Sequence, residues 1–260
     1  MNASNTLSWP ADRYAIGAFI QHHLSDLALK KTHFLFYPDD QWLDIGCGDG
    51  GYTLKLAMQI PHGKIIGRDP SEAMIAVANQ RKKPNTVSFA CEDAMRLTDV
   101  NSFTVITAFW CMQWINDINE VLKRIYAALK NHGRFFAIYP SSHCLHIRLF
   151  RMIQQNPLFS FLKSFKIPAH FPSPTVCEQQ AKKLGFASFQ STTIHQRIAL
   201  PDISIFERFI DGIPFFNNQV PVEKISVLNA AMVDAFKQLC DTEFHGLYFQ
   251  DEMVVLTGVK

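Results

Sequence analysis

The sequence has no large excess of charge of either sign. Its 25 Lys and Arg residues are nearly balanced by 23 Asp and Glu residues, which gives a formal net charge of +2 with neutral histidines. This balance excludes a strongly basic nucleic-acid-binding protein, although local charged patches are compatible with it. The chain also lacks any apolar run of about eighteen residues, and residues 1–30 lack a basic segment followed by an apolar core. We therefore expect no membrane span, no signal peptide and a cytoplasmic location.

Paired cysteines are missing as well. The six cysteines are scattered and none belongs to a C-x-x-C motif, so we predict free thiols rather than a disulfide framework. A chain of 260 residues can bury a large core without disulfide or metal support. Phenylalanine, by contrast, is abundant, and its 22 residues indicate an aromatic core or an apolar pocket.

Short apolar runs alternate with amphipathic segments from residue 41 to residue 139. This alternation predicts a doubly wound α/β fold, in which helices cover both faces of a mostly parallel sheet. Pro70 fits the first position of a helix that Asp69 would cap, and Asn-His-Gly at 131–133 fits a helix end. The predicted strands are Trp42–Ile45, Lys64–Gly67, Thr86–Ala90, Phe103–Phe109 and Arg134–Tyr139, and the predicted helices are Tyr52–Gln59, Ser71–Gln80 and Asp117–Lys130.

The segments on either side of this unit have a different character. An amphipathic stretch, Asp12–Leu29, lies in a predicted N-terminal helical segment, 1–35. Residues 141–172 are rich in Phe and Leu and contain four cations but no Asp or Glu, and we predict that they cap the active edge of the sheet. The whole chain, 1–260, is thus expected to form one domain. The remaining predicted elements are helices near Thr175–Leu184, Asp202–Asp211 and Pro221–Cys240, and strands Ser188–Leu200 and Glu252–Val259.

A glycine-rich stretch, WLDIGCGDGG (residues 42–51), begins with the first predicted strand. Gly46, Gly48 and Gly51 form a G-x-G-x-x-G pattern, while Gly46, Gly48 and Gly50 form G-x-G-x-G equally well. The turn after the first strand of such a sheet is where a ligand is expected, and glycine lets the backbone turn sharply and approach it. No Lys follows Gly51 as a P-loop would require, so that motif is excluded.

Acidic residues near the strand ends decide which ligand the loop holds. Asp44 and Asp49 would repel a pyrophosphate but attract an ammonium group. Asp69, at the end of the second strand, is placed to accept both ribose hydroxyls, and Asp93 or the Ala94 backbone is placed to meet an adenine edge. S-adenosylmethionine (SAM) carries an ammonium, a sulfonium and a ribose, so we predict a SAM site. The predicted cofactor-binding residues are Asp44, Gly46, Cys47, Gly48, Gly50, Asp69, Pro70, Asp93, Ala94, Phe109 and Gln21.

These residues resemble the motifs of class I SAM-dependent methyltransferases, which have a Rossmann-like fold. LDIGCGDG (43–50) is similar to the first motif of that family, IIGRDPSEAMIAVA (65–78) to the second and CEDA (91–94) to the third. Residues 103–139 resemble the fourth strand, the following helix and the fifth strand. The resemblance implies a seven-stranded sheet with one antiparallel strand, completed by the last two predicted strands. Thr104 departs from the family, which usually has an Asp of mainly structural role at that position.

Shorter likenesses point to a subgroup that methylates carboxylates. MQWINDI (112–118) and DISIFERFIDGIPFF (202–216) resemble the trans-aconitate and juvenile hormone acid methyltransferases. DRYAIGAFIQHHLSDLAL (12–29) resembles the malonyl-acyl-carrier-protein methyltransferases. These likenesses imply an enzyme that forms a methyl ester on a small-molecule carboxylate or on an acceptor bound to an acyl-carrier protein, without a nucleic-acid partner.

Methylation of a carboxylate requires no general base, because a carboxyl group with a pKa of about 4 is already ionised at neutral pH. Catalysis then depends on placing the nucleophile in line with the methyl group and on excluding water. The resembling families place a substrate-contacting Trp at Trp114, and Gln113 and Tyr14 are further candidates to orient the carboxylate. Tyr14 and Gln21 are candidates to close over the cofactor from the N-terminal helix. Arg148, in the acid-free segment, is the candidate for a salt bridge to the substrate.

Several alternatives stay open. Trp114 and Tyr14 also fit ordinary packing roles, and the cations of 141–172 also fit a solvated face. Arg81, Lys82 and Lys83 fit a solvated helix end. For function, the alternatives are carbon or nitrogen methylation of a small metabolite and a non-catalytic SAM-fold binding protein. A nucleic-acid methyltransferase is disfavoured because no [N/D]-P-P-Y motif follows the fourth strand, and a metal site is disfavoured because 143–146 lacks a second pair of ligands.

Overall fold

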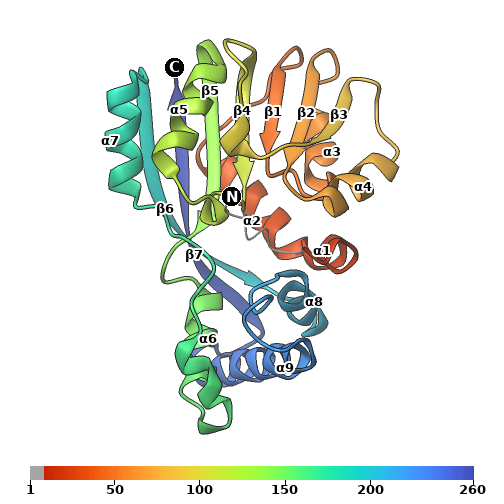
Figure 1. The fold of residues 1–260 in the computed structure, drawn as a ribbon, viewed down its shortest axis with the longest axis vertical. Coiled ribbons are helices and arrows are strands. Elements are labelled where there is room, and N and C mark those ends of the chain that lie inside the picture. The colour runs from red at the N-terminus through yellow and green to blue at the C-terminus, as the bar shows by residue number, and fades with distance from the viewer. Residues whose placement is uncertain (1–8) are drawn as a thin grey trace. The chain divides into compact units, whose positions relative to one another are not determined.

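Seven strands form one sheet within residues 9–260, which the computed structural model describes; of Asp12 and Ala15 only the backbone is described (Figure 1). The strand order is β3-β2-β1-β4-β5-β7-β6, in which β1 to β5 pair in parallel and β7 is antiparallel to β5. The predicted doubly wound, mostly parallel fold is therefore confirmed. The strands are β1 (Gln41–Ile45), β2 (Lys64–Asp69), β3 (Val87–Cys91), β4 (Phe103–Phe109), β5 (Leu129–Pro140), β6 (Ser188–Ala199) and β7 (Tyr248–Val259).

Helices occupy most of the connections between these strands. None of them, in the part of the chain that the structure describes, is long and apolar enough to cross a membrane. The α-helices are α1 (Ala11–Gly17), α2 (Phe19–Lys31), α3 (Gly51–Ala57), α4 (Glu72–Gln80), α5 (Ile118–Ala128), α6 (Leu145–Gln154), α7 (Pro174–Leu184), α8 (Ser204–Gly212) and α9 (Val222–Leu239). Shorter turns are the 3₁₀ segments η1 (Ala94–Arg96), η2 (Met112–Trp114) and η3 (Pro157–Ser164) and the π-helical η4 (Cys240–Phe244).

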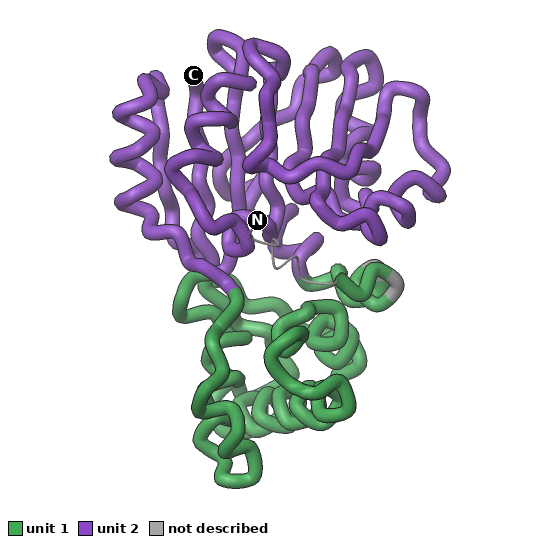
Figure 2. The backbone as a smooth tube through the Cα atoms, in the orientation of Figure 1, with its two compact units in different colours: residues 1–20, 141–168, 195–252 green, residues 21–140, 169–194, 253–260 purple. Residues whose placement is uncertain are grey.

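The chain divides into two compact units, each built from separate stretches of sequence (Figure 2). Unit 1 holds residues up to Ile20, residues 141–168 and residues 195–252. Unit 2 holds residues 21–140, 169–194 and 253–260, and with them the parallel strands. The sequence led us to expect one domain with a cap over 141–172; in the structure most of that segment belongs to unit 1, together with α8 and α9. Residues 1–8 of the predicted N-terminal segment lie outside the described residues.

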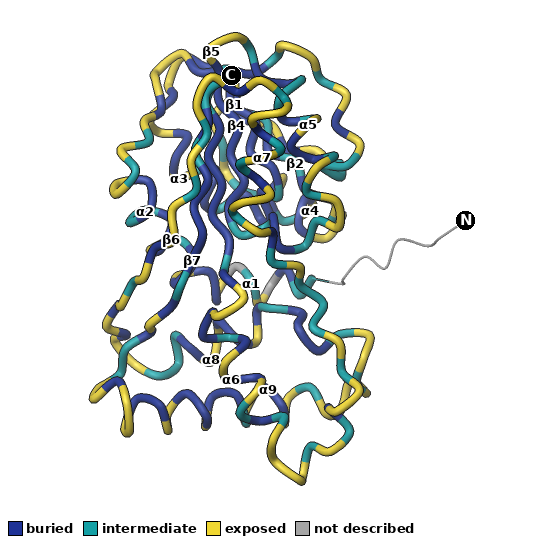
Figure 3. The backbone as a smooth tube through the Cα atoms, turned by 90° about the vertical axis from the view of Figure 1, so that its left-hand side faces the viewer, coloured by how far each residue is buried: buried dark blue, intermediate teal, exposed yellow. Residues whose placement is uncertain are grey.

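The core of unit 2 follows the two-residue alternation of its strands. Leu43 and Phe135 are fully buried in a cluster that includes side chains of α5 and α7. Their sequence neighbours Trp42 and Phe136 point to the opposite face, where they contact Phe36 and Phe34 with ring centroids about 5 Å apart. Figure 3 accordingly shows α2 and α3 on one side of the buried central strands and α5 and α7 on the other. Both faces of the sheet are thus covered, as predicted.

The core of unit 1 is largely aromatic. Phe206 of α8 stacks on Phe236 of α9 with ring centroids 3.9 Å apart. Phe150 of α6 packs against Phe215 and Phe216 at centroid distances of 5.2 and 6.2 Å. Part of the excess of phenylalanine seen in the sequence therefore forms a packed core in this unit.

Several predicted element boundaries are wrong by a few residues, for physical reasons. The predicted N-terminal helix is interrupted at Ala18, next to Gly17, which packs so closely on the backbone of α8 that a Cβ would lie 2.2 Å from the Arg208 carbonyl oxygen. Helix α5 ends at Ala128 rather than Lys130, because the strand that follows already begins at Leu129, paired with β4. Strand β7 begins four residues before the predicted Glu252, at Tyr248.

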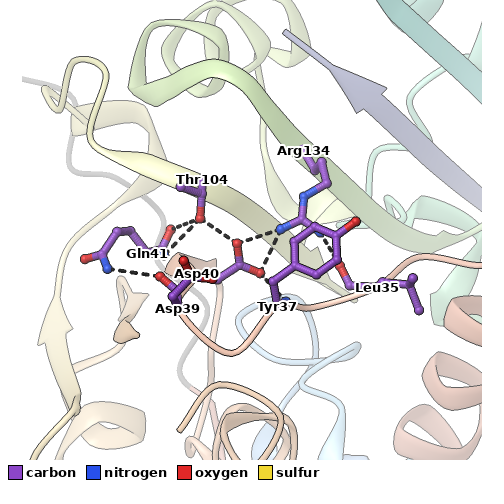
Figure 4. Close-up of polar contacts among 7 residues, drawn as sticks. All are labelled: Leu35, Tyr37, Asp39, Asp40, Gln41, Thr104 and Arg134. Atoms are coloured by element: carbon purple, nitrogen blue, oxygen red, sulfur yellow. Dashed lines mark hydrogen bonds and ion pairs between the residues drawn. The ribbon is translucent and has the colours of Figure 1, made fainter. Parts of the chain in front are cut away.

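A polar network around the buried Asp40 joins the amino ends of β1 and β4 to Arg134, in the middle of β5 (Figure 4). Asp40, 3% exposed, accepts hydrogen bonds from Thr104 at 2.6 Å and from the Arg134 guanidinium at 2.6 and 2.7 Å. Thr104 also accepts the backbone N–H of Gln41 at 2.9 Å. Arg134 lies over the ring of Tyr37, 4.1 Å from its centroid. Thr104 therefore has a structural role at the position where the family usually has an Asp.

Replacing Asp40 with Ala is expected to lower the free energy of unfolding by about 3–5 kcal/mol, because Arg134 would keep a mostly buried charge without its partner. Thr104→Val removes the neutral hydrogen bond from the Gln41 N–H and the charge-assisted bond to Asp40. It should lower the free energy of unfolding by less, about 1–2 kcal/mol. Urea unfolding followed by circular dichroism measures both effects. Asp39→Ala, at the exposed neighbouring position, is the matched control, and an equal loss in this control would contradict the role of the network.

Candidate cofactor and acceptor site

The glycine loop after β1 is held in a backbone conformation that only glycine adopts easily. Gly46, Gly48 and Gly50 have φ angles of +67°, +55° and +72°, whereas Gly51 begins helix α3 with an ordinary helical backbone. A Cβ on Gly50 would lie 2.6 Å from the ring of Phe89. The backbone therefore requires the G-x-G-x-G pattern, and Gly51 is not part of the turn.

The loop lies where the strand order of the sheet reverses. Strand β1 pairs with β2 on one side and with β4 on the other, so the carboxyl ends of β1 and β4 flank the switch point. Open α/β sheets bind their ligands at this point. The site predicted from the sequence therefore falls at the position that the topology favours.

Asp69, at the end of β2, holds the loop in place. One carboxylate oxygen accepts the backbone N–H of Gly48 at 2.9 Å, and the other accepts the backbone N–H of Ser71 at 2.9 Å. Burial raises the pKa of Asp69, and these two N–H groups oppose that rise. The helix that follows begins at Glu72 with Ser71 as its N-cap, so the prediction that Pro70 occupies the first helical position after an Asp69 cap is wrong. Pro70 lies instead in the link between Asp69 and the cap.

Asp44 faces the protein interior rather than an open site. Its two carboxylate oxygens accept hydrogen bonds from the hydroxyl groups of Thr53, at 2.5 Å, and Thr107, at 2.7 Å. Burial raises the pKa of Asp44 to about 7, although both hydroxyl groups act to lower it. Asp44 thus ties strand β1 to β4 and to helix α3.

Asp49 also has an internal partner. Arg81, just after α4, forms an ion pair with the Asp49 carboxylate and donates from Nε to the Asp49 backbone oxygen at 2.7 Å. The interpretation of Arg81 as part of a solvated helix end is therefore wrong. The carboxylate of Asp49 further accepts the N–H of Gly51 at 3.1 Å. Both loop acids that were expected to attract an ammonium group are engaged by side chains of the protein itself.

The other predicted cofactor residues are spread along the same edge of the sheet. Asp93 caps the short η1 turn by accepting the N–H of Met95 at 2.9 Å, and Ala94 follows it, partly exposed. Cys47 is buried in the glycine loop, where burial raises the pKa of its thiol. Phe109, at the end of β4, packs edge-on against Tyr52 with ring centroids 4.8 Å apart.

The turn after β4 joins the loop to the N-terminal part of unit 2. A Cβ on Gly46 would lie 2.3 Å from the Cβ of Cys111, so the turn packs directly on the glycine loop. Trp110 has a φ angle of +58°, rare for a residue with a side chain, and its indole N–H donates to the backbone oxygen of Gln21 and to the hydroxyl of Ser25 at 3.1 and 2.8 Å. Gln113, buried in the η2 turn, follows three residues later.

The predicted acceptor residues fall in both units. Gln113 and the partly buried Trp114 lie in unit 2, on the η2 turn. Tyr14 and Arg148 lie in unit 1, where Tyr14 packs edge-on against Trp9 with ring centroids 5.5 Å apart. Arg148 forms a two-pronged ion pair with Glu243. The roles predicted for these four residues stay predictions.

Sequence reasoning missed some of the residues that shape this site. Trp110 carried no recognisable motif, because its positive φ and its bonds to Gln21 and Ser25 arise only in the folded chain. Arg81 was visible only as part of a basic run, since its partner Asp49 lies 32 positions earlier. Thr107 had one usable signal, a polar residue in the middle of a strand that is mostly apolar.

Comparison with known families identifies this part of the chain. Residues 43–133 match the family model described as a methyltransferase domain. The chain contains a methyltransferase domain. The matched region extends from β1 into β5 and includes the glycine loop, Asp69, Asp93 and the turn after β4. The predicted resemblance to methyltransferases is therefore confirmed.

Curated relatives of the methyltransferase domain act on different acceptors. The chain is 33% identical over 123 residues to the malonyl-[acyl-carrier protein] O-methyltransferase of Bacillus cereus, an alignment that covers 47% of this chain and 45% of that protein. It is 32% identical over 106 residues to the trans-aconitate 2-methyltransferase of Deinococcus radiodurans, covering 41% and 40%. It is 31% identical over 166 residues to the demethylmenaquinone methyltransferase of Lactococcus lactis, covering 57% and 66%. The chain spans half or less of the length of the first curated relatives that it matches.

Solved structures with the same fold cover nearly the whole chain. YcgJ of Bacillus subtilis has a TM-score of 0.61 at 18% identity, covering 92% of this chain and 98% of that one. Phosphoethanolamine N-methyltransferase 2 of Haemonchus contortus, solved in complex with S-adenosyl-L-methionine, has a TM-score of 0.62 at 20% identity, covering 96% and 56%. At these identities the comparison establishes the class I methyltransferase fold.

Gly50→Ala is expected to weaken binding of S-adenosylhomocysteine strongly and to destabilise the chain, because the new Cβ meets Phe89 and the backbone is left-handed at this position. Gly51→Ala is the matched control: its Cβ would have 3.3 Å to the nearest atom and an ordinary helical φ, so a small effect is expected. Titration calorimetry and thermal melting measure binding and stability. Equal effects of the two substitutions would contradict the assignment of the G-x-G-x-G pattern.

Asp44→Asn is expected to change how stability depends on pH. The folded-state pKa of about 7 lies above the unfolded value of about 4, so the folded chain keeps a proton that the unfolded chain releases. The free energy of unfolding of the wild type should therefore fall as the pH rises from about 4 to about 7. The free energy of unfolding of Asp44→Asn, relative to that of the wild type, should therefore rise by on the order of 2–4 kcal/mol between pH 4 and pH 7.

Urea unfolding at several pH values measures this difference. Asp251, whose pKa burial also raises to about 7, is present in both proteins, so the difference between them isolates Asp44. A difference that stays constant between pH 4 and pH 7 would show that Asp44 does not titrate in this range.

Proposed function

We propose that this chain is a SAM-dependent methyltransferase that forms methyl esters on carboxylates, carried either by a small molecule or by an acyl-carrier protein. The observation that carries the proposal is the glycine loop at the β1–β4 switch point, clamped by Asp69 inside a matched methyltransferase domain. The cofactor and the reaction class are those of the family. The acceptor class is supported by the names of the malonyl-[acyl-carrier protein] and trans-aconitate relatives.

The residues present fit this cofactor. The left-handed backbone at Gly46 and Gly48 lets the loop turn sharply at the switch point, and Asp69 keeps lone pairs free on both oxygens for the ribose hydroxyls. Asp93 and Ala94, which follow β3, are our candidates for contact with the adenine. Oε1 of Gln113 is a buried side-chain oxygen without a partner in the described part of the chain, and it lies on the turn packed against the loop.

SAM, when bound, supplies a methyl group on a sulfonium, which makes that carbon electrophilic. An acceptor carboxylate would need no general base, because it is already ionised at neutral pH. The chain's residues would therefore orient the carboxylate and exclude water rather than act as a base. Trp114 is our first candidate for orienting it, with Tyr14 and Arg148 as further candidates.

Carbon methylation of a quinone-like ring is a second candidate. Of the three relatives described above, the demethylmenaquinone methyltransferase is the one whose alignment covers the largest share of both chains. Such a reaction requires removal of a proton from the ring or its hydroxyl group, so its rate should fall steeply at acidic pH. The ester reaction lacks this requirement, which makes the two candidates distinguishable by their pH profiles.

Methyl transfer from labelled SAM to a panel of acceptors tests the proposal. Malonyl-acyl-carrier protein, trans-aconitate, fatty acids, a demethylmenaquinone analogue and simple amines would be compared, with Asp69→Ala as the control that lacks the loop clamp. We expect an alkali-labile product from one or more carboxylates and a nearly constant rate from pH 6 to 9. Label transferred only to the quinone or amine would refute ester formation, and the absence of any heat on titration with SAM would refute the enzyme assignment.

A further inference from the structure

One buried amide in the methyltransferase domain has an atom that nothing in the described chain satisfies. Gln113 is only 6% exposed. Its side-chain Nε2 donates a hydrogen bond to the backbone oxygen of Trp110 at 2.7 Å. Its Oε1 is buried and has no hydrogen-bond partner among the described residues. Because the Trp110 oxygen can only accept, the amide must present its nitrogen there, and the unpaired atom is the carbonyl oxygen.

The surroundings of Gln113 keep this amide in position. Its backbone oxygen accepts the N–H of His170 at 2.7 Å. The backbone of Trp110 is held at a positive φ while its indole is anchored to Gln21 and Ser25. Buried polar atoms without a partner are few in native proteins, and strained backbone is concentrated at functional sites. The two features coincide in one turn, which points to a ligand that completes the missing hydrogen bond.

The position of the turn indicates which ligand this is. Cys111, two residues before Gln113, is the residue against which Gly46 packs, and its thiol lies 3.2 Å from the backbone oxygen of Ile45. The turn therefore packs directly against the glycine loop, where we propose that the cofactor binds. A ligand group that satisfies Oε1 must be a hydrogen-bond donor. An ionised acceptor carboxylate has no donor, whereas SAM has ribose hydroxyls, an adenine amino group and an α-ammonium group. Because we assign the ribose to Asp69 and the adenine to Asp93 or Ala94, the ammonium group is the donor that is left for Oε1.

The two acids of the glycine loop, Asp44 and Asp49, already have partners in the protein. Asp44 is engaged by Thr53 and Thr107, and Asp49 by Arg81. An ammonium group that enters the loop therefore finds both carboxylates already bonded, while the Gln113 oxygen is unpaired. Building on the proposed function, we infer that Oε1 of Gln113 accepts a hydrogen bond from the α-ammonium group of SAM. Gln113 then serves the cofactor rather than the acceptor carboxylate that it was expected to orient.

The experiment compares two ligands that differ in the amino-acid portion. S-adenosylhomocysteine carries the ammonium group, while 5′-methylthioadenosine keeps the adenosine and the sulfur but lacks it. Gln113→Leu should weaken S-adenosylhomocysteine binding about tenfold to hundredfold, as expected for a lost hydrogen bond to a charged group. Its affinity for 5′-methylthioadenosine should stay within about twofold of the wild type. Titration calorimetry measures the affinity of the wild type and of Gln113→Leu for each of the two ligands.

Binding of 5′-methylthioadenosine also shows that the Gln113→Leu variant is folded. Gln59→Leu, the same substitution at an exposed position of unit 2, is the matched control and should leave both affinities unchanged. An unchanged affinity of Gln113→Leu for S-adenosylhomocysteine would overturn the inference. So would an equal loss for both ligands, because Gln113 would then support the loop without recognising the ammonium group. A raised KM for the acceptor with unchanged S-adenosylhomocysteine affinity would return Gln113 to the acceptor. If the wild type bound neither ligand, the proposed function itself would fail.

Discussion

The hydrogen bond between the Gly48 N–H and the Asp69 carboxylate is the contact on which the site depends. It fixes a loop of three left-handed glycines, and it joins the backbone after the end of β1 to a side-chain carboxylate at the end of β2. Because the second Asp69 oxygen holds the N-cap of α4, the same carboxylate positions a helix as well as the loop. A change in any of these parts moves the others, which gives the loop a defined shape before a ligand arrives.

The structure also changes the role of charge at this site. Two carboxylates beside the glycines indicated attraction for an ammonium group, but one has its oxygens bonded to two hydroxyl groups in the interior and the other is paired with Arg81. Their net effect on a ligand is therefore weaker than the sequence suggests. Recognition of a cation would then depend on oriented dipoles, such as the Gln113 amide oxygen that we propose, and the strength of such an interaction rises when water is excluded.

The parts predicted well from the sequence are those that local pattern determines. The parallel strands are short apolar runs between amphipathic helices, and the glycines and Asp69 lie at fixed distances along the chain. What could not be predicted depends on contacts between distant residues. Trp110 meets Ser25 across 85 positions, and Arg81 meets Asp49 across 32. Unit 1 combines three separate stretches of sequence, so the acid-free segment 141–172 suggested a cap of its own although most of it packs with residues from 195–252.

The balance of charges within unit 1 bears on how a carboxylate acceptor would be recognised. Across its whole sequence unit 1 has nine Lys and Arg residues against ten Asp and Glu residues, and Arg148 is paired with Glu243. The cations of 141–172 are thus balanced by acids of the same unit. Strong cationic binding would also be poorly suited to the chemistry, because the carboxylate loses its charge as the ester forms and an ion pair would stabilise the substrate more than the transition state. A neutral donor, the role that we propose for the Trp114 indole, would orient a carboxylate without this penalty.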